Sequence, residues 1–145
     1  MAREAILRDT KNKTSTRYTC ATTTGIAKGC FLKLSADKTA AASTGTADIF
    51  VGFAHADVNK SSDTNFNTET SVTADKGGVY ELVASGSITK GDMLQTAVPG
   101  NYVMTIPEVA TTGTSFNLTS VLQRIVGMAL EDGDADETIN VQVVC

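Results

Sequence analysis

The sequence of 145 residues contains no Trp, only two Pro, and few aromatic side chains, five Phe and three Tyr. No stretch approaches the run of roughly 18 apolar residues that a membrane-spanning helix needs, so membrane insertion is not expected. The first 17 residues are rich in charge and lack the apolar segment of a secretory signal. We therefore expect the protein to be made and kept in a cytoplasm, and the length suits one domain.

Histidine and cysteine, on which much enzyme chemistry depends, are also scarce. His55 is the only histidine, and although Asp57 could orient it as a base, nothing in the sequence places a cysteine beside it. A structural imidazole in an apolar strand is the preferred explanation. Cys20, Cys30 and Cys145 have no C-x-x-C spacing, which argues against a zinc site or a disulfide framework. We predict free thiols, two of them packed as small apolar side chains.

Motifs of known chemistry are missing as well. The sequence has no G-x-S-x-G, no G-x-x-x-x-G-K-[ST], no G-x-G-x-x-G and no H-E-x-x-H. The acidic run 131–137 could attract calcium, but the EF-hand pattern fails at Glu137 and Val143, so a solvated hairpin tip is preferred. We predict no enzyme, no catalytic residues, no metal, no cofactor, no small-molecule substrate and no nucleic-acid partner.

Short apolar runs cut by Gly, Asn and Asp at intervals of roughly ten residues favour many short strands, as in sandwiches and small barrels. The abundance of Thr favours the same class. We predict an all-β fold, a small β-barrel or sandwich-like domain with an extended N-terminal arm. The predicted strands are Cys30–Leu34, Ile49–His55, Ser71–Ala74, Val79–Ala84, Met93–Thr96, Tyr102–Ile106, Gln123–Leu130 and Thr138–Val144, with 18–24 as a first edge strand or a connector.

The C-terminal region shows the clearest hairpin pattern. Ile139, Val141 and Val143 alternate with polar residues, so one face of this strand should be buried. Asp132-Gly133 is a turn dipeptide between this strand and the one before it. We therefore predict a β-hairpin that closes the fold.

One short pattern occurs twice in the same order. Residues 26–32 and 88–94 match I-x-K-G-x-x-L, and V-G-x-A follows each, at 51–54 and 126–129. Lys-Gly predicts a tight turn into a strand, and the Gly of V-G-x-A permits a bulge or a close backbone approach. The common order predicts two similar halves, and the second half is longer through the stretch 107–118.

Charge is spread unevenly along the chain, whose net charge is −4. Residues 1–17 carry five basic and two acidic side chains, net +3, while the remainder carries seven basic and fourteen acidic, net −7. A basic arm ahead of an acidic body predicts a segment that lies on another, acidic surface, such as that of a neighbouring identical subunit. The alternative is a solvated tail. The candidate contact residues are Arg3, Arg8, Lys11, Lys13 and Arg17.

From Gly25 onward a family resemblance appears. The order G-I-x-K-G, D-I-F-V-G-F-A-H-A-D-V, G-G-V-Y-E-L-V-A-S-G-S-I-T-K-G-D-M-L and R-I-V-G-M-A-L-E-D-G resembles the capsid decoration, or cement, proteins of tailed bacteriophages. The resemblance covers about five-sixths of the chain and leaves residues 1–24 as the arm ahead of a barrel-like domain, 25–145. Polar inserts at 59–70 and 107–118 depart from the compact family pattern.

The resemblance implies a structural role on a virion. A decoration protein sits on the outer surface of a viral head, binds the major capsid protein and stabilises contacts between its subunits. Such proteins are often homotrimers, and they have no catalytic residues to carry over.

Two other classes stay open at this point. A secreted or surface-displayed β-sandwich module for adhesion or carbohydrate binding would also be all-β and rich in Thr. It would be expected to expose aromatic side chains for sugar stacking and to use a secretion route. A small-barrel enzyme with active sites between subunits would need a polar cluster that one sequence does not reveal. The decoration protein is the preferred prediction.

Overall fold

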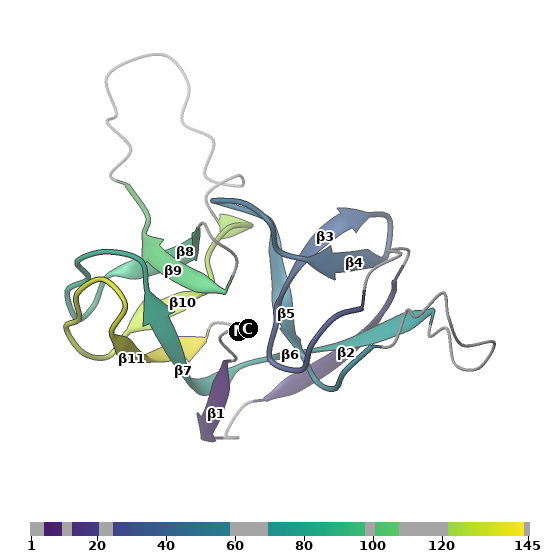
Figure 1. The fold of residues 1–145 in the computed structure, drawn as a ribbon, viewed down its shortest axis with the longest axis horizontal. Helices are drawn as coiled ribbons and strands as arrows, with labels where there is room; N and C mark the ends of the chain where they lie inside the picture. The colour runs from purple at the N-terminus through teal and green to yellow at the C-terminus, as the bar shows by residue number, and fades with distance from the viewer. Residues whose placement is uncertain are drawn as a thin grey trace, which may run out of the picture.

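The structure is a computed structural model, and it describes residues 5–9, 13–20, 25–58, 70–97, 101–107 and 122–143. These residues form eleven β-strands (Figure 1). The strands are β1 (Ile6–Asp9), β2 (Thr14–Thr19), β3 (Phe31–Ala36), β4 (Thr39–Ala42), β5 (Phe50–Ala54), β6 (Ser71–Lys76), β7 (Gly78–Ala84), β8 (Met93–Ala97), β9 (Tyr102–Thr105), β10 (Gly127–Ala129) and β11 (Thr138–Val143). The predicted all-β class is confirmed. Among the described residues, no helix has the length and apolar character to cross a membrane.

Ten of these strands close into two five-stranded barrels. The first barrel has the order β2-β4-β3-β5-β6 and closes where β6 pairs with β2. The second barrel contains β7-β11-β10-β8-β9 and closes where β9 pairs with β7, while β1 adds to the edge of β7. The barrels lie side by side, and Gly77 alone separates β6 of the first from β7 of the second (Figure 1).

The two barrels share one topology, which confirms the two halves predicted from the repeat. In each, the first strand runs parallel to the third, β2 with β4 and β7 with β9, and all other pairs are antiparallel. The repeated motifs also make the same contacts. The Gly29 N–H donates to the Ala54 carbonyl and the Gly91 N–H to the Ala129 carbonyl, both at 2.8 Å.

The turn that enters the second strand of each barrel is fixed in the same way. The Asp57 carboxylate accepts a hydrogen bond from the Lys28 N–H at 2.7 Å, and the Asp132 carboxylate accepts one from the Lys90 N–H at 2.8 Å. Each carboxylate thus satisfies a backbone donor of the Lys-Gly turn. Asp57 and Asp132 are therefore structural residues of the repeat.

Strand pairing does not begin at residue 25. β1 pairs with β7, and β2 pairs with β6 over six residues, from Thr14 opposite Lys76 to Thr19 opposite Ser71. The described part of the predicted arm is therefore built into both sheets, and the boundary predicted at residue 24 falls inside the first barrel. The physical reason is closure, because without β2 the backbone groups of β6 would lack a partner at this edge.

Two other local predictions differ from the structure. β4 was not predicted, because its sequence Thr-Ala-Ala-Ala lacks large apolar side chains, although Ala40 is fully buried in the first barrel. The C-terminal hairpin is confirmed by the pairing of β10 with β11. However, its turn lies at Ala135–Asp136, where Asp136 has a φ of 69°, while Gly133 forms an isolated bridge with Ile88.

Each barrel has its own apolar interior, and a third group of side chains packs between them. The first interior contains Cys20, Ile26, Leu32, Ala40, Ala54, Val58, Val72 and Ala74. The second contains Leu82, Ala84, Ile88, Leu94, Val103, Val126, Ala129, Ile139, Val141 and Val143. Phe31, Phe50 and Phe53 come from β3 and β5 of the first barrel but pack with the second group and with Tyr80. Ring centroids are 5.0 Å apart for Phe31 and Phe53 and 4.4 Å for Phe53 and Tyr80.

Buried and partly buried hydrogen bonds also join the barrels. The Phe31 N–H donates to Oδ1 of Asn101, which precedes β9, at 2.9 Å. The Thr96 hydroxyl accepts from the Asp48 N–H at 3.0 Å and donates to the Gly45 carbonyl at 3.1 Å. Since unpaired buried polar groups are costly, these bonds fix how the barrels meet as well as holding them together.

Replacing either repeated glycine of V-G-x-A by alanine should destabilise the fold. A Cβ on Gly52, whose φ is 139°, would lie 2.7 Å from the Asp75 carbonyl oxygen, and one on Gly127 would collide with the Gln142 carbonyl oxygen. We expect Gly52→Ala and Gly127→Ala each to lower the free energy of unfolding by about 1–3 kcal/mol, because backbone must move. Urea denaturation measures this.

Gly86→Ala is the matched control for this pair. Nothing lies within 4 Å of a Cβ at Gly86, so its substitution should change stability by less than about 0.5 kcal/mol. Unchanged midpoints for Gly52→Ala and Gly127→Ala would show that close strand contact does not set these positions.

Candidate functional site

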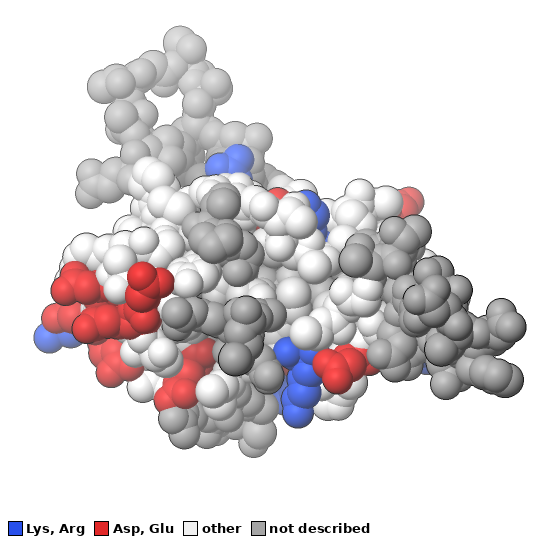
Figure 2. Space-filling model, viewed as in Figure 1, with Lys and Arg blue, Asp and Glu red and all other residues white. Residues whose placement is uncertain are grey.

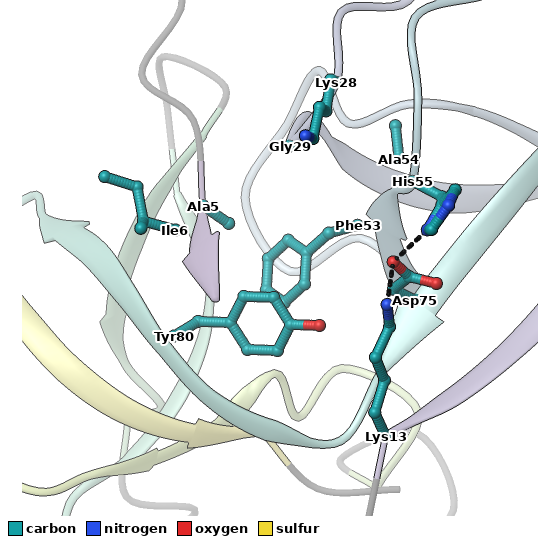
Figure 3. Close-up of a pocket in the computed structure, with 10 residues that line it drawn as sticks. All are labelled: Ala5, Ile6, Lys13, Lys28, Gly29, Phe53, Ala54, His55, Asp75 and Tyr80. Atoms are coloured by element: carbon teal, nitrogen blue, oxygen red, sulfur yellow. Dashed lines mark hydrogen bonds and ion pairs between the residues drawn. The ribbon is translucent and has the colours of Figure 1, made fainter. Parts of the chain in front are cut away.

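A cavity of about 390 Å³ lies where the two barrels and the N-terminal segment meet (Figure 3). Its lining combines charged side chains with buried aromatic rings. The lining residues are Ala5, Ile6, Lys13, Lys28, Gly29, Phe53, Ala54, His55, Asp75 and Tyr80. Because it gathers residues from both barrels, we take it as the candidate site.

The Asp75 carboxylate is the polar centre of this cavity. Its side chain is 10% exposed and accepts hydrogen bonds from Ser15 Oγ at 2.6 Å and from His55 Nδ1 at 2.7 Å, and Lys13 Nζ lies at 3.0 Å. Burial by itself would raise the pKa of Asp75. The hydrogen bonds from Ser15, His55 and Lys13, together with the charge of Lys13, outweigh burial and hold that pKa below its usual value.

The His55 environment corrects one sequence interpretation. Asp75 rather than Asp57 pairs with the imidazole, since Asp57 instead accepts from the Lys28 N–H. The His55 side chain is 55% exposed, and no Ser, Thr or Cys is among the described residues that line the cavity. The histidine and carboxylate therefore link the end of β5 to β6, and the ion pair of Asp75 with Lys13 adds the segment before β2.

The Tyr80 hydroxyl is the one buried side-chain polar atom without a hydrogen-bond partner in the described part of the chain. It points into the cavity toward Asp75 and Lys13 (Figure 3). Burial, and secondarily the negative charge of Asp75, raises the pKa of Tyr80 to about 12. The phenol is neutral near pH 7 and can donate to or accept from a group that enters the cavity.

The predicted contact residues fall into two groups. Lys13 pairs with Asp75, and Arg17 donates from Nε and Nη2 to the Ser71 hydroxyl at 3.0 and 2.8 Å, so both are engaged within the chain. Arg8 lies on β1, and its side chain is outside the described part. Arg3 and Lys11 lie outside the described residues. Sequence reasoning missed Asp75 and Tyr80, because their meeting depends on the packing of one barrel on the other.

Acidic side chains gather on the second barrel (Figure 2). Several of these carboxylates are used in local bonds: Glu137 accepts from the Asp134 N–H at 2.8 Å, Glu131 from the Asn140 N–H at 2.6 Å, and Asp136 from the Tyr102 hydroxyl at 3.1 Å. Among the described residues, no group of three or more His, Cys, Asp or Glu is arranged to hold a metal.

The described cysteines, Cys20 and Cys30, do not form a disulfide. Cys20 is buried in the first barrel, and Cys30 is half-buried. Burial raises the pKa of the Cys30 thiol, and the hydrogen bond with Asn101 opposes this with a smaller effect. The raised pKa favours the unreactive thiol form. Cys145 lies outside the described residues.

Comparison with known proteins gives a likeness to a solved structure. No protein-family model matches the chain, and no curated protein matches its sequence. Among solved structures, the chain is similar to the crystal structure of the head fiber gp8.5 N base of bacteriophage phi29, with a TM-score of 0.50 and 12% identity. The alignment covers 91% of this chain and 94% of that one. At this identity the likeness shows that the two proteins share a fold.

The contribution of Asp75 to the stability of the fold should depend on pH. Because the folded-state pKa of Asp75 is below its ordinary value of 3.8, the ionised carboxylate stabilises the fold above that value. This stabilisation is lost as the pH falls through the lower folded-state pKa. We expect Asp75→Asn to be less stable than wild type by about 1–3 kcal/mol at pH 7. The difference should shrink below pH 3.8.

Thermal unfolding between neutral and strongly acidic pH measures this difference. Asp37→Asn, in the exposed turn between β3 and β4, is the control and should follow the wild-type curve at every pH. A constant gap between Asp75→Asn and wild type across this range would contradict the assignment.

Proposed function

We propose that this protein is a structural component of a tailed-phage head that decorates the outer capsid surface and stabilises contacts between major capsid protein subunits. Fold likeness to a phage head fiber base over nearly the whole of both chains is the observation that carries this proposal. The sequence resemblance to decoration proteins points in the same direction. The protein acts without catalysis, as a homo-oligomer and specifically a trimer, and is made in the host cytoplasm before it joins the virion.

The architecture supports a role of this kind. Aromatic packing and a buried hydrogen bond hold the two barrels together in one arrangement, as a structural component requires. β1 pairs with β7 on one side, and in the described part of the chain its other edge has no strand partner. Such an edge can add to a neighbouring sheet through backbone hydrogen bonds. Several joined copies bind a repeating shell firmly even when each contact is modest.

The test adds purified protein to phage heads stripped of decoration, followed by cryo-electron microscopy. We expect ordered density between capsomers. Bare heads under the same conditions would contradict the proposal, and a glycan-binding screen would then address the adhesion alternative.

A charge variant tests the basic N-terminal residues separately. Deletion of residues 2–17 is unsuitable, because it removes most of β2 and opens the first barrel. We expect Arg3→Gln with Lys11→Gln to lower head binding at least about threefold, since each surface charge contributes roughly 0.2–1 kcal/mol and several copies bind together. Quantitative binding to heads at low and high salt measures this effect.

Lys90→Gln with Arg124→Gln removes the same charge from the second barrel, at one exposed and one half-buried side chain, and is the control. Equal binding by the two double variants would remove Arg3 and Lys11 from the interface.

A further inference from the structure

The two barrels have the same topology but unequal surroundings. The outer face formed by β3 and β5 of the first barrel is covered by the second barrel. Phe31 and Phe53, which pair directly across these strands, are 1% and 2% exposed. Their equivalents in the second barrel are Met93 and Met128, which pair in the same register across β8 and β10 and are 37% and 36% exposed.

Leu130 extends this uncovered surface. It follows the V-G-x-A strand of the second barrel as His55 follows that of the first, and it is 43% exposed. We call Met93, Met128 and Leu130 the methionine face. A contiguous exposed apolar patch is a candidate protein-binding surface.

The surface that covers Phe31 and Phe53 also has an uncovered equivalent. On the second barrel, Tyr80 packs on Phe53, Asn101 accepts from the Phe31 N–H, and Thr96 beside them bonds the turn at Gly45 and Asp48. These three residues are 3%, 8% and 1% exposed. The equivalents on the first barrel follow from the strand registers. They are Thr16, Leu34 and Lys38, all exposed, and we call them the Leu34 face.

The equivalence of these residues is supported by backbone geometry. Lys38 and Asn101 each precede the third strand of their barrel, and both are non-glycine residues with positive φ, 49° and 72°. Leu34 pairs with Ala40 as Thr96 pairs with Val103, and Ala40 and Val103 are both fully buried. Each molecule therefore has two uncovered surfaces. The methionine face on the second barrel corresponds to the covered Phe31 and Phe53 side of the internal contact, and the Leu34 face on the first barrel corresponds to the side that covers it.

We propose that the methionine face of one copy packs against the Leu34 face of a second copy, repeating between molecules the contact that joins the two barrels within one molecule. This deepens the self-association part of the proposed function by naming its surfaces. The contact is head-to-tail. The rotation that relates one copy to the next therefore decides whether the assembly closes into a ring, such as a trimer, or continues as a filament.

Charge complementarity favours a second copy in this orientation. The described residues 13–20, 25–58 and 70–76 of the first barrel carry six basic and four acidic side chains. Those of the second, 78–97, 101–107 and 122–143, carry two basic and seven acidic. A head-to-tail contact brings barrels of opposite net charge together, whereas two methionine faces in symmetric contact would bring two acidic barrels together.

Two face variants and their mixture test the proposal. Met128→Asp disables the methionine face, and Leu34→Asp disables the Leu34 face. Leu122→Asp is the control, because Leu122 is 58% exposed and belongs to neither face. Circular dichroism melting checks that each variant is folded, and light scattering after size exclusion gives the molar mass.

We expect wild type and Leu122→Asp to form oligomers and each face variant alone to be a monomer. An equal mixture of Met128→Asp and Leu34→Asp should form a dimer that grows no further, since each contributes its one intact face. Monomeric wild type, oligomers of both face variants, or self-association of Leu34→Asp alone would each overturn the proposal. The test uses no phage heads, so bare heads with an oligomeric protein would contradict only the decoration function.

Discussion

Aromatic packing between the barrels is the contact on which the rest of the structure depends. Phe31, Phe50 and Phe53 point away from the interior of the first barrel and are buried only because Tyr80 and the second barrel cover them. Full burial of such side chains stabilises by about 1.5–3 kcal/mol each, which is large beside the marginal stability of a domain. The same contact creates the cavity around Asp75 and leaves the Tyr80 hydroxyl without a partner. The candidate site is thus a product of how the barrels meet.

Duplication of one topology explains both the sequence repeat and the differences between the halves. Positions that serve the barrel itself stay alike, such as Gly52 and Gly127, where strands approach too closely for a side chain. Positions that face outward differ according to what covers them, Phe in the first barrel and Met in the second. The divergence of equivalent residues therefore carries information about neighbours that a single barrel would not provide.

Much of the fold could be predicted from sequence, because strand periodicity and the Lys-Gly and V-G-x-A motifs are local signals. β4 could not, since a run of Ala has no alternation, and β2 was hidden in a charged segment whose exposed Thr and Arg residues give no apolar face. The candidate site was even harder to predict from the sequence than these strands. Asp75 and Tyr80 lie in ordinary strand positions, and only the tertiary contact between β6, β7 and the N-terminal segment brings them together. The arm residues were chosen for charge, and structure gives two of them, Lys13 and Arg17, partners in the same chain.

The pairing of β2 with β6 sets an order on synthesis. Residues 14–19 meet their antiparallel partner only when residues 71–76 have left the ribosome, and β7 in turn waits for residues 138–143. Until β7 emerges, the three Phe rings on the first barrel face water. A nascent chain at this stage displays apolar side chains of the kind that chaperones bind. On a polysome, where many such chains are close together, timely completion of the second barrel protects each chain from pairing with its neighbour.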